Sequence, residues 1–163
     1  MDILICVGAS EFGLDRLLKY VDELCEEKVL DGNRIVAQTG CSKYKPIHYK
    51  SFNLIDREDF VKYVDKSEVL ISHAGTGSVT PALKKGKKVI VFPRLKDYGE
   101  HIDNHQLELA EVFTVNGYTM CATTKEELKD SLLKISSFVP KKSISNTENM
   151  NRLIIETIDN WFK

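Results

Sequence analysis

The 163-residue sequence lacks a charge excess of either sign. Its 23 Lys and Arg residues nearly balance 24 Asp and Glu residues, and the formal net charge is -1. This balance disfavours a general footprint for nucleic acid or for an anionic membrane. One local exception is a cluster of four lysines that could touch a membrane surface, although we favour the solvated end of a helix. The cluster consists of Lys84, Lys85, Lys87 and Lys88.

The sequence also has few cysteines and no long apolar run. The four cysteines stand far apart, without CxxC or Cys/His ligand spacing, which excludes a zinc-site pattern and a disulfide framework. A reduced, cytoplasmic setting is the simplest interpretation. No segment approaches the ~20 apolar residues that a membrane span needs. The N-terminus runs into an apolar strand without a basic leader, so we expect no signal peptide.

What the sequence does contain is an alternation of strand-length apolar runs and segments with helical periodicity. Continuous β-branched strands separated by helices predict a Rossmann-like, doubly wound parallel α/β sheet of about six strands. Four expected helices have clear starting points: a stripe from Leu14, the residues after Asp56, the residues after Asn104, and Thr124 with Glu127 in a capping box. The expected strands are 3–7, 34–38, 47–52, 69–72, 89–92 and 118–122.

A further helix should follow the glycine-rich segment 72–78. Proline is tolerated only in the first turn of a helix, so Pro81 predicts that this helix starts near Gly77 or Ser78. Glycine-lined backbone then lies just ahead of the helix N-terminus, where free amides favour anions.

The chain should comprise one Rossmann-like domain at 1–140, whose ligand is considered below, and an amphipathic helix at 145–163. Ser145 and Glu148 suggest a capping box for this helix. Its apolar residues repeat at helical spacing and end in Trp161 and Phe162. The stripe could pack on its own domain or dock on a partner.

Three segments should meet at the carboxyl ends of the strands, where doubly wound sheets bind ligands. Segment 8–13 has two glycines but does not match GxGxxG, and a plain turn explains it about as well. Segment 72–78 we interpret as a diphosphate site in preference to a tight structural turn; it does not match the P-loop pattern. Its His73 could contact a ligand or be a satisfied histidine at a strand end.

The third segment, 93–106, is a long polar loop of the kind that compact domains seldom keep without a use. Its side chains suit sugar hydroxyls, and we expect Gln106 to contact a sugar. Alternatively, Asp103 is a good N-cap with Gln106 as its capping-box partner. A metal site from His101, Asp103 and His105 is disfavoured because an N-cap Asp103 would turn away from it. We expect no metal and no cofactor, as the family resemblance described next also implies.

These segments together resemble the glycosyltransferase family 28 C-terminal domain. The resemblance rests on 72–78, on 82–90, on Pro93 with Arg94, and on 103–110; the segments 7–12 and 38–40 fit as well. It covers most of residues 1–135. Similar groups are the donor half of a bacterial peptidoglycan N-acetylglucosaminyltransferase and the small subunit of a two-part eukaryotic dolichol-linked enzyme. Segment 94–101 looks closest to bacterial exopolysaccharide and capsule subunits, which are often β-1,4-galactosyltransferases.

The resemblance implies a site for a UDP-sugar on this chain. It places one set of residues around the diphosphate, another near the donor sugar, and a third at the cleft floor. These are, in that order, Gly75, Thr76, Gly77 and Ser78; Asn104, His105 and Gln106; and Gly8, Ser10 and Phe12. Arg94 is also expected to contact substrate. The family's ribose-binding glutamate falls at Pro81, which cannot do that job, so Glu100 or backbone groups would have to substitute.

The implied activity is that of an inverting GT-B hexosyltransferase. It would move galactose or N-acetylglucosamine from a UDP-sugar to a lipid-linked saccharide acceptor. The family's general base lies on a second Rossmann-like domain, which we expect on a membrane-anchored partner that holds this chain at the inner face of the membrane. His73 and His105 are the fallback catalytic candidates. A non-catalytic nucleotide-sugar-binding module is the alternative.

Overall fold

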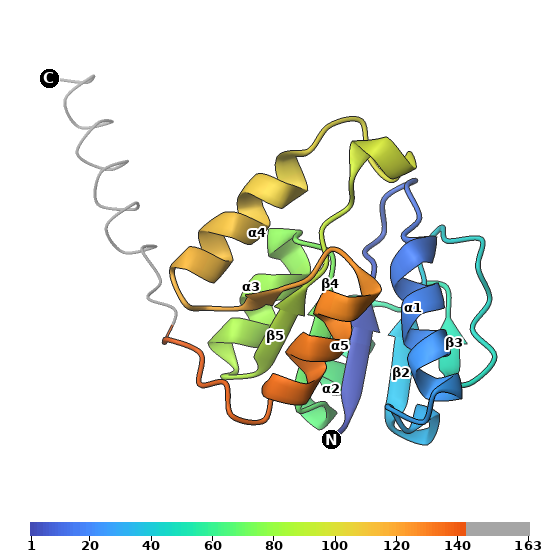
Figure 1. Cartoon of the computed structure of the whole chain (residues 1–163), viewed down its shortest axis with the longest axis horizontal. Coiled ribbons are helices and arrows are strands. Elements are labelled where there is room, and N and C mark those ends of the chain that lie inside the picture. Colours follow the sequence, from blue (N-terminus) through green and yellow to red (C-terminus); the bar gives the residue numbers. More distant parts are fainter. Residues whose placement is uncertain (143–163) are drawn as a thin grey trace, which may run out of the picture.

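The computed structural model describes residues 1–142, and they form one parallel sheet covered by helices on both faces (Figure 1). The six strands lie in the order β3-β2-β1-β4-β5-β6, and every pair is parallel. The prediction of a doubly wound α/β sheet is therefore confirmed. The helix predicted at 145–163 lies outside the described residues, so the proposed division of the chain stays a prediction. The strands are Ile3–Cys6, Ile35–Gln38, Lys50–Phe52, Val69–Ser72, Lys88–Val91 and Met120–Cys121.

The helices cover the two faces because alternate strand residues point to opposite sides. On one face, β1 packs Ile3 and Ile5 against α1 (Asp15–Glu26) and α5 (Lys125–Lys134). On the other face, Leu4 and Cys6 pack with α2 (Arg57–Lys66), α3 (Thr76–Lys84) and α4 (His105–Val115). Two short 3₁₀ segments, Gly32–Arg34 and Lys96–Tyr98, complete the described elements. Burial on both faces explains the continuous apolar strands.

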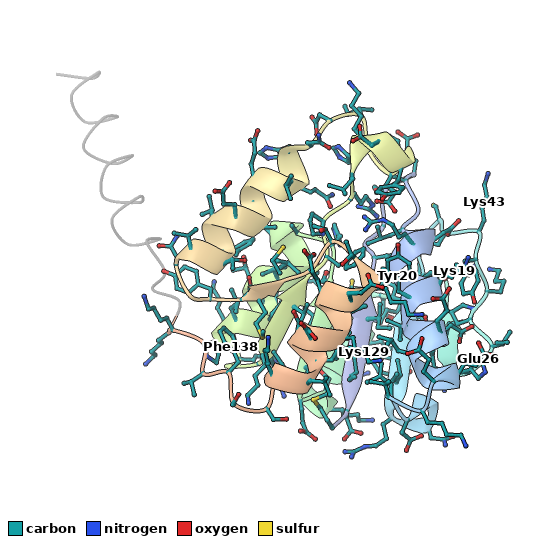
Figure 2. All side chains as sticks on the ribbon, in the orientation of Figure 1. Lys19, Tyr20, Glu26, Lys43, Lys129 and Phe138 are labelled. Carbon is teal, nitrogen blue, oxygen red and sulfur yellow. The ribbon has the colours of Figure 1, made fainter. Side chains whose placement is uncertain are left out.

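Polar side chains also join α1 to its neighbours on its face of the sheet (Figure 2). Tyr20 of α1 meets Phe92 edge-on, with ring centroids 6.1 Å apart. Lys129 of α5 pairs with Glu27 at 3.3 Å. Asp22 of α1 is buried and accepts hydrogen bonds from the backbone of Ile47 and His48 at 3.1 and 2.9 Å. Because these two amides bond to a carboxylate, they are not available to a neighbouring strand. Strand β3 therefore begins only at Lys50, later than the sequence predicted.

Most helix starts follow the predicted signals. The capping box of Thr124 and Glu127 is present, and Asp56 caps α2 through a hydrogen bond from the Asp59 amide. The prediction for Pro81 was wrong: α3 starts at Thr76, so the proline is its sixth residue. The first turn closes ahead of it, because the Ser78 and Val79 amides both reach the Gly75 carbonyl at 3.2 Å. The proline then removes only a later hydrogen bond, to the Gly77 carbonyl.

Candidate functional site

Three loops gather beyond the carboxyl ends of β1, β4 and β5 (Figure 1). The strand order reverses direction between β1 and β4, which makes this the topological switch point of the sheet. A hollow of about 360 Å³ lies there. Its lining comes from the ends of β1 and β2, the start of α2, His73 after β4, and the first turn of α3. The structure thus brings Gly8, His73, Gly77 and Ser78 together in the lining of one hollow.

The N-terminus of α3 faces this hollow. Gly75 is the N-cap and supplies no side-chain cap, and Thr76 and Gly77 are exposed. Amides at the first helical positions have no acceptor within their own helix. A Cβ built on Gly77 would meet no heavy atom within 4 Å. Free amides, open space and the helix dipole are the features that favour an anion at a helix N-terminus.

The His73 ring lies between the two glycine turns. A Cβ on Gly8 would come within 2.6 Å of His73 Cε1, and one on Gly75 would clash with Nε2. Gly8 also has a φ of +82°, a conformation that favours glycine. Nδ1 lies 3.3 Å from the Cys6 carbonyl, so the tautomer protonated there donates to it. Both glycines are therefore required by the imidazole they enclose.

Burial, with Arg94 nearby, lowers the pKa of His73 to about 4. The ring is therefore neutral at pH 7 and adds no full positive charge to the anion site. A low pKa also makes it a weak general base. The next residue back, Ser72, joins β4 to α3: its hydroxyl lies 2.8 Å from Ser78 Oγ and donates to the Cys6 carbonyl at 2.8 Å.

Arg94 does not present its guanidinium to a ligand, contrary to the predicted substrate contact. The residue is only 1 % exposed. Its side chain donates to the backbone carbonyls of Val7, Phe12 (2.9 Å) and Gly13 (3.3 Å). Three carbonyls after β1 therefore accept from Nε and one terminal nitrogen of the guanidinium, and Arg94 holds that loop against the segment after β5.

Glu100, the predicted substitute for a ribose contact, is occupied as well. It is 7 % exposed and forms a two-pronged ion pair with Arg16, with Nε–Oε1 and NH2–Oε2 distances of 3.0 and 2.8 Å. It also accepts from the Leu95 amide at 3.0 Å. Both carboxylate oxygens are thus used inside the protein. Sequence reasoning missed Arg16, because it sits in an ordinary amphipathic helix with no motif around it.

The predicted sugar-contacting residues lie at the start of α4. Gln106 is buried, and its Oε1 accepts from the Arg94 amide at 3.1 Å. The capping box with Asp103 was therefore wrong: Asp103 Oδ1 accepts from the His105 amide at 3.0 Å, while Gln106 turns inward. Asn104 Oδ1 accepts from the Lys96 amide at 3.0 Å. His105 is exposed, with Nδ1 3.5 Å from Glu108.

The loop after β1 separates the first hollow from a second one of about 490 Å³. Phe12 and Tyr98 contribute aromatic rings to its lining, and Lys43 projects outward at its margin (Figure 2). Phe12 also contacts His101, with ring centroids 5.4 Å apart, and Ser10 is exposed on the same loop with its hydroxyl 3.5 Å from the Phe12 carbonyl. The predicted floor residues therefore lie along the ridge between two hollows.

Residues 1–142 contain neither a metal-binding cluster nor a membrane-spanning helix. No group of three or more His, Cys, Asp or Glu side chains is arranged to hold a metal ion. No helix in the same range is long and apolar enough to cross a membrane.

Residues 2–158 match the model of the glycosyltransferase family 28 C-terminal domain. The chain is 37 % identical over 99 residues to UDP-N-acetylglucosamine transferase subunit ALG13 of Candida glabrata, covering 58 % of this chain and 48 % of that protein. It is 32 % identical over 135 residues to the Homo sapiens protein of the same name, covering 76 % and 11 %. The chain thus spans about half of the first relative's length and far less of the second's.

Solved structures share the fold. The NMR solution structure of ALG13 superposes with a TM-score of 0.62 and 23 % identity, covering 96 % of both chains. The crystal structure of Acinetobacter baumannii MurG gives a TM-score of 0.58 with 19 % identity, covering 85 % of this chain and 42 % of that one.

Proposed function

Because the chain belongs to the glycosyltransferase family 28 C-terminal domain family, we propose that it is the donor-binding subunit of an inverting hexosyltransferase. The donor is a UDP-sugar and the acceptor is a lipid-linked saccharide. The names of the similar proteins favour N-acetylglucosamine as the sugar. Galactose is the alternative, on the likeness of segment 94–101 to exopolysaccharide and capsule subunits.

One observation carries the proposal: the uncapped N-terminus of α3 opens into the hollow at the switch point of the sheet. A diphosphate placed there would accept hydrogen bonds from the Thr76 and Gly77 amides. The Gly8 turn across the hollow allows close approach, since no side chain stands on it. We place the sugar that follows the diphosphate beside the start of α4, where Asn104 and His105 are exposed and Gln106 is buried.

In this reaction the departing UDP gains negative charge as the glycosidic bond breaks. Amide dipoles directed at the diphosphate stabilise that charge without reorganisation, which is the largest contribution this chain can make. A helix N-terminus contributes about 0.3–1 kcal/mol at an exposed site, and more in a closed, dry cleft. We assign no metal to this step, because the helix end supplies the positive potential.

The acceptor hydroxyl needs a general base. His73 has a low pKa and is enclosed by two glycine turns, so we place the base on a second domain that closes the cleft. The similar proteins are named as subunits, which supports a separate partner chain. We propose a membrane-anchored, Rossmann-like partner that holds this chain at the cytoplasmic face of the membrane in exopolysaccharide or capsule synthesis.

Isothermal titration calorimetry with UDP, UDP-N-acetylglucosamine and UDP-galactose tests donor binding, with ADP as the control nucleotide. We expect UDP to bind and one UDP-sugar to be preferred. Transfer from that UDP-sugar is then measured with the co-purified partner and a lipid-linked saccharide. If UDP binds no more tightly than ADP, the donor-binding role is refuted. Binding without transfer by the pair would leave a non-catalytic nucleotide-sugar module.

A further inference from the structure

Two arginines cross between the loops that form the proposed donor site. Arg94, at the start of the segment after β5, reaches the backbone of the loop after β1 at Phe12 and Gly13. Arg16, the second residue of α1, reaches in the opposite direction, toward the segment after β5. It contacts Glu100 and donates to the Pro93 carbonyl at 3.2 Å. Each loop is therefore held by an arginine that originates beside the other.

The Arg16 end of this arrangement is closely enclosed. Its guanidinium carbon lies 4.4 Å from the centre of the Phe92 ring and 4.6 Å from that of Tyr98. The Arg16 and Glu100 side chains are each only 8 % exposed. Arg16 also donates to the Thr123 carbonyl beyond β6. Two aromatic rings within cation–π distance and paired hydrogen bonds to a carboxylate suit a guanidinium better than an ammonium group.

Glu100 passes this restraint to the segment that leads to α4. It accepts from the Leu95 amide, and Asn104 accepts from the next amide, Lys96. Gln106 accepts from the Arg94 amide. Three consecutive backbone amides, at residues 94, 95 and 96, are thus held by side chains from the far end of the same loop. Without Glu100 in place, Asn104 and Gln106 would lose part of the frame that sets their position.

We propose that Arg16 and Glu100 are positioning residues for the sugar half of the donor. The pair fixes the segment 95–104, and through it Asn104 to Gln106, relative to the phosphate-binding turns. This inference rests on the proposed function. The diphosphate position depends on different contacts. These are the α3 N-terminus, the His73 ring, and the hydrogen bonds by which Arg94 holds the loop after β1. Loss of the Arg16–Glu100 pair should therefore affect the sugar and spare UDP.

The variants Arg16→Lys and Glu100→Gln test the proposal, because each keeps a polar group but loses the paired geometry. Binding of UDP and of the UDP-sugar that the wild-type chain prefers is measured by calorimetry. We expect the UDP-sugar affinity to fall roughly tenfold, in line with the cost of a small misplacement. The UDP affinity should stay within about twofold, a change below 0.5 kcal/mol. Arg94→Lys should instead weaken both ligands.

Lys125→Gln is the matched control, because it removes a different ion pair that also involves α1. Lys125 of α5 pairs with Glu23 of α1 and with the C-cap residue Glu27, each at 2.7 Å, on the side of α1 that meets α5. It should change neither affinity. If a single variant fails to fold, Arg16→Gln combined with Glu100→Gln removes both buried charges together and takes its place.

The outcomes separate the two proposals. Equal weakening of UDP and UDP-sugar by Arg16→Lys, or no weakening of either, would overturn the positioning role while leaving donor binding intact. A wild-type chain that binds UDP-N-acetylglucosamine and UDP-galactose with equal affinity would also overturn it, since no sugar-specific contact would then exist to position. A wild-type chain that binds no UDP would refute the proposed function itself.

Discussion

Replacing Gly77 separates ligand binding from folding more cleanly than any other change at the site. Gly77 lines the hollow at the switch point, and a Cβ there would meet no heavy atom within 4 Å. A side chain therefore fills the space proposed for the diphosphate and displaces nothing in the protein. Exchanging glycine for alanine in a helix is favourable by up to about 1 kcal/mol. Gly77→Ala and Gly77→Val should therefore keep or raise the melting temperature.

The same changes should weaken UDP. Hydrogen bonds to a charged group contribute about 1.5–3 kcal/mol each, and the Thr76 and Gly77 amides supply two. Blocking both by Gly77→Val should cost about 3 kcal/mol or more, roughly a hundredfold in the dissociation constant. Gly77→Ala should have a smaller effect, because one methyl group fills less of the space.

Calorimetric titration with UDP, paired with a thermal unfolding scan, measures both quantities on the same samples. Lys84→Ala, in the exposed last turn of α3, is the control and should change neither. Wild-type UDP affinity in Gly77→Val would refute the placement of the diphosphate at this helix end. A lower melting temperature with unchanged affinity would show that Gly77 serves the fold instead.

Three further predictions concern the stability of the fold, through Gln106, His73 and Asp22. Gln106→Ala removes the acceptor for the buried Arg94 amide and should cost about 1–3 kcal/mol in unfolding free energy; Gln106→Glu, which keeps an acceptor oxygen, should lose less, and equal losses in urea titration would contradict the assigned contact. The pKa of His73 is lowered to about 4 by burial, so its contribution to stability is complete above about pH 6.5 and declines as the pH falls toward 4, by up to about 3 kcal/mol. The difference between the urea midpoints of wild type and His73→Gln should therefore be larger at pH 7 than at pH 4. An equal difference at both pH values would refute the buried neutral imidazole. Desolvation opposes ionisation of Asp22, but hydrogen bonds from His48, Tyr44 and Ile47 outweigh it and keep its pKa below the ordinary range. Its contribution is then present above about pH 4 and is lost below that. Asp22→Asn should lower the unfolding free energy by about 1–3 kcal/mol at pH 7 and expose the loop 42–48 to amide hydrogen exchange, whereas unchanged protection there would contradict the anchoring role.

Local signals in the sequence predicted the elements well where each depended on its own residues. The capping box at Thr124 and Glu127 and the cap at Asp56 formed as expected. Errors arose where a distant group competed. Ile47 and His48 suit a strand, yet the buried carboxylate of Asp22 takes their amides. Gln106 suits a capping box, yet it turns inward to the Arg94 amide.

The site shows the same division. Segment 72–78 predicted a glycine-lined helix start from residues that are neighbours in the chain, and α3 begins at the switch point of the sheet. Arg94 was expected to contact substrate from its place in the polar loop, and Glu100 was expected as a substitute for the ribose contact that Pro81 cannot make. Whether such a side chain is free depends on its partners, and these came from α1 and from the loop after β1, some 80 residues away.

The sequence by itself determined the sheet, its alternating helices, the family and the glycine-lined turn before α3, since each of these is recorded in local periodicity or contiguous motifs. Tertiary structure alone decided which charged groups remain available to a ligand. Arg16 carries no motif, and its pairing with Glu100 across 84 positions appears only once α1 and the segment after β5 lie side by side. A buried charge is stable only with a partner in place, and here the tertiary fold brings Arg16 and Glu100 together.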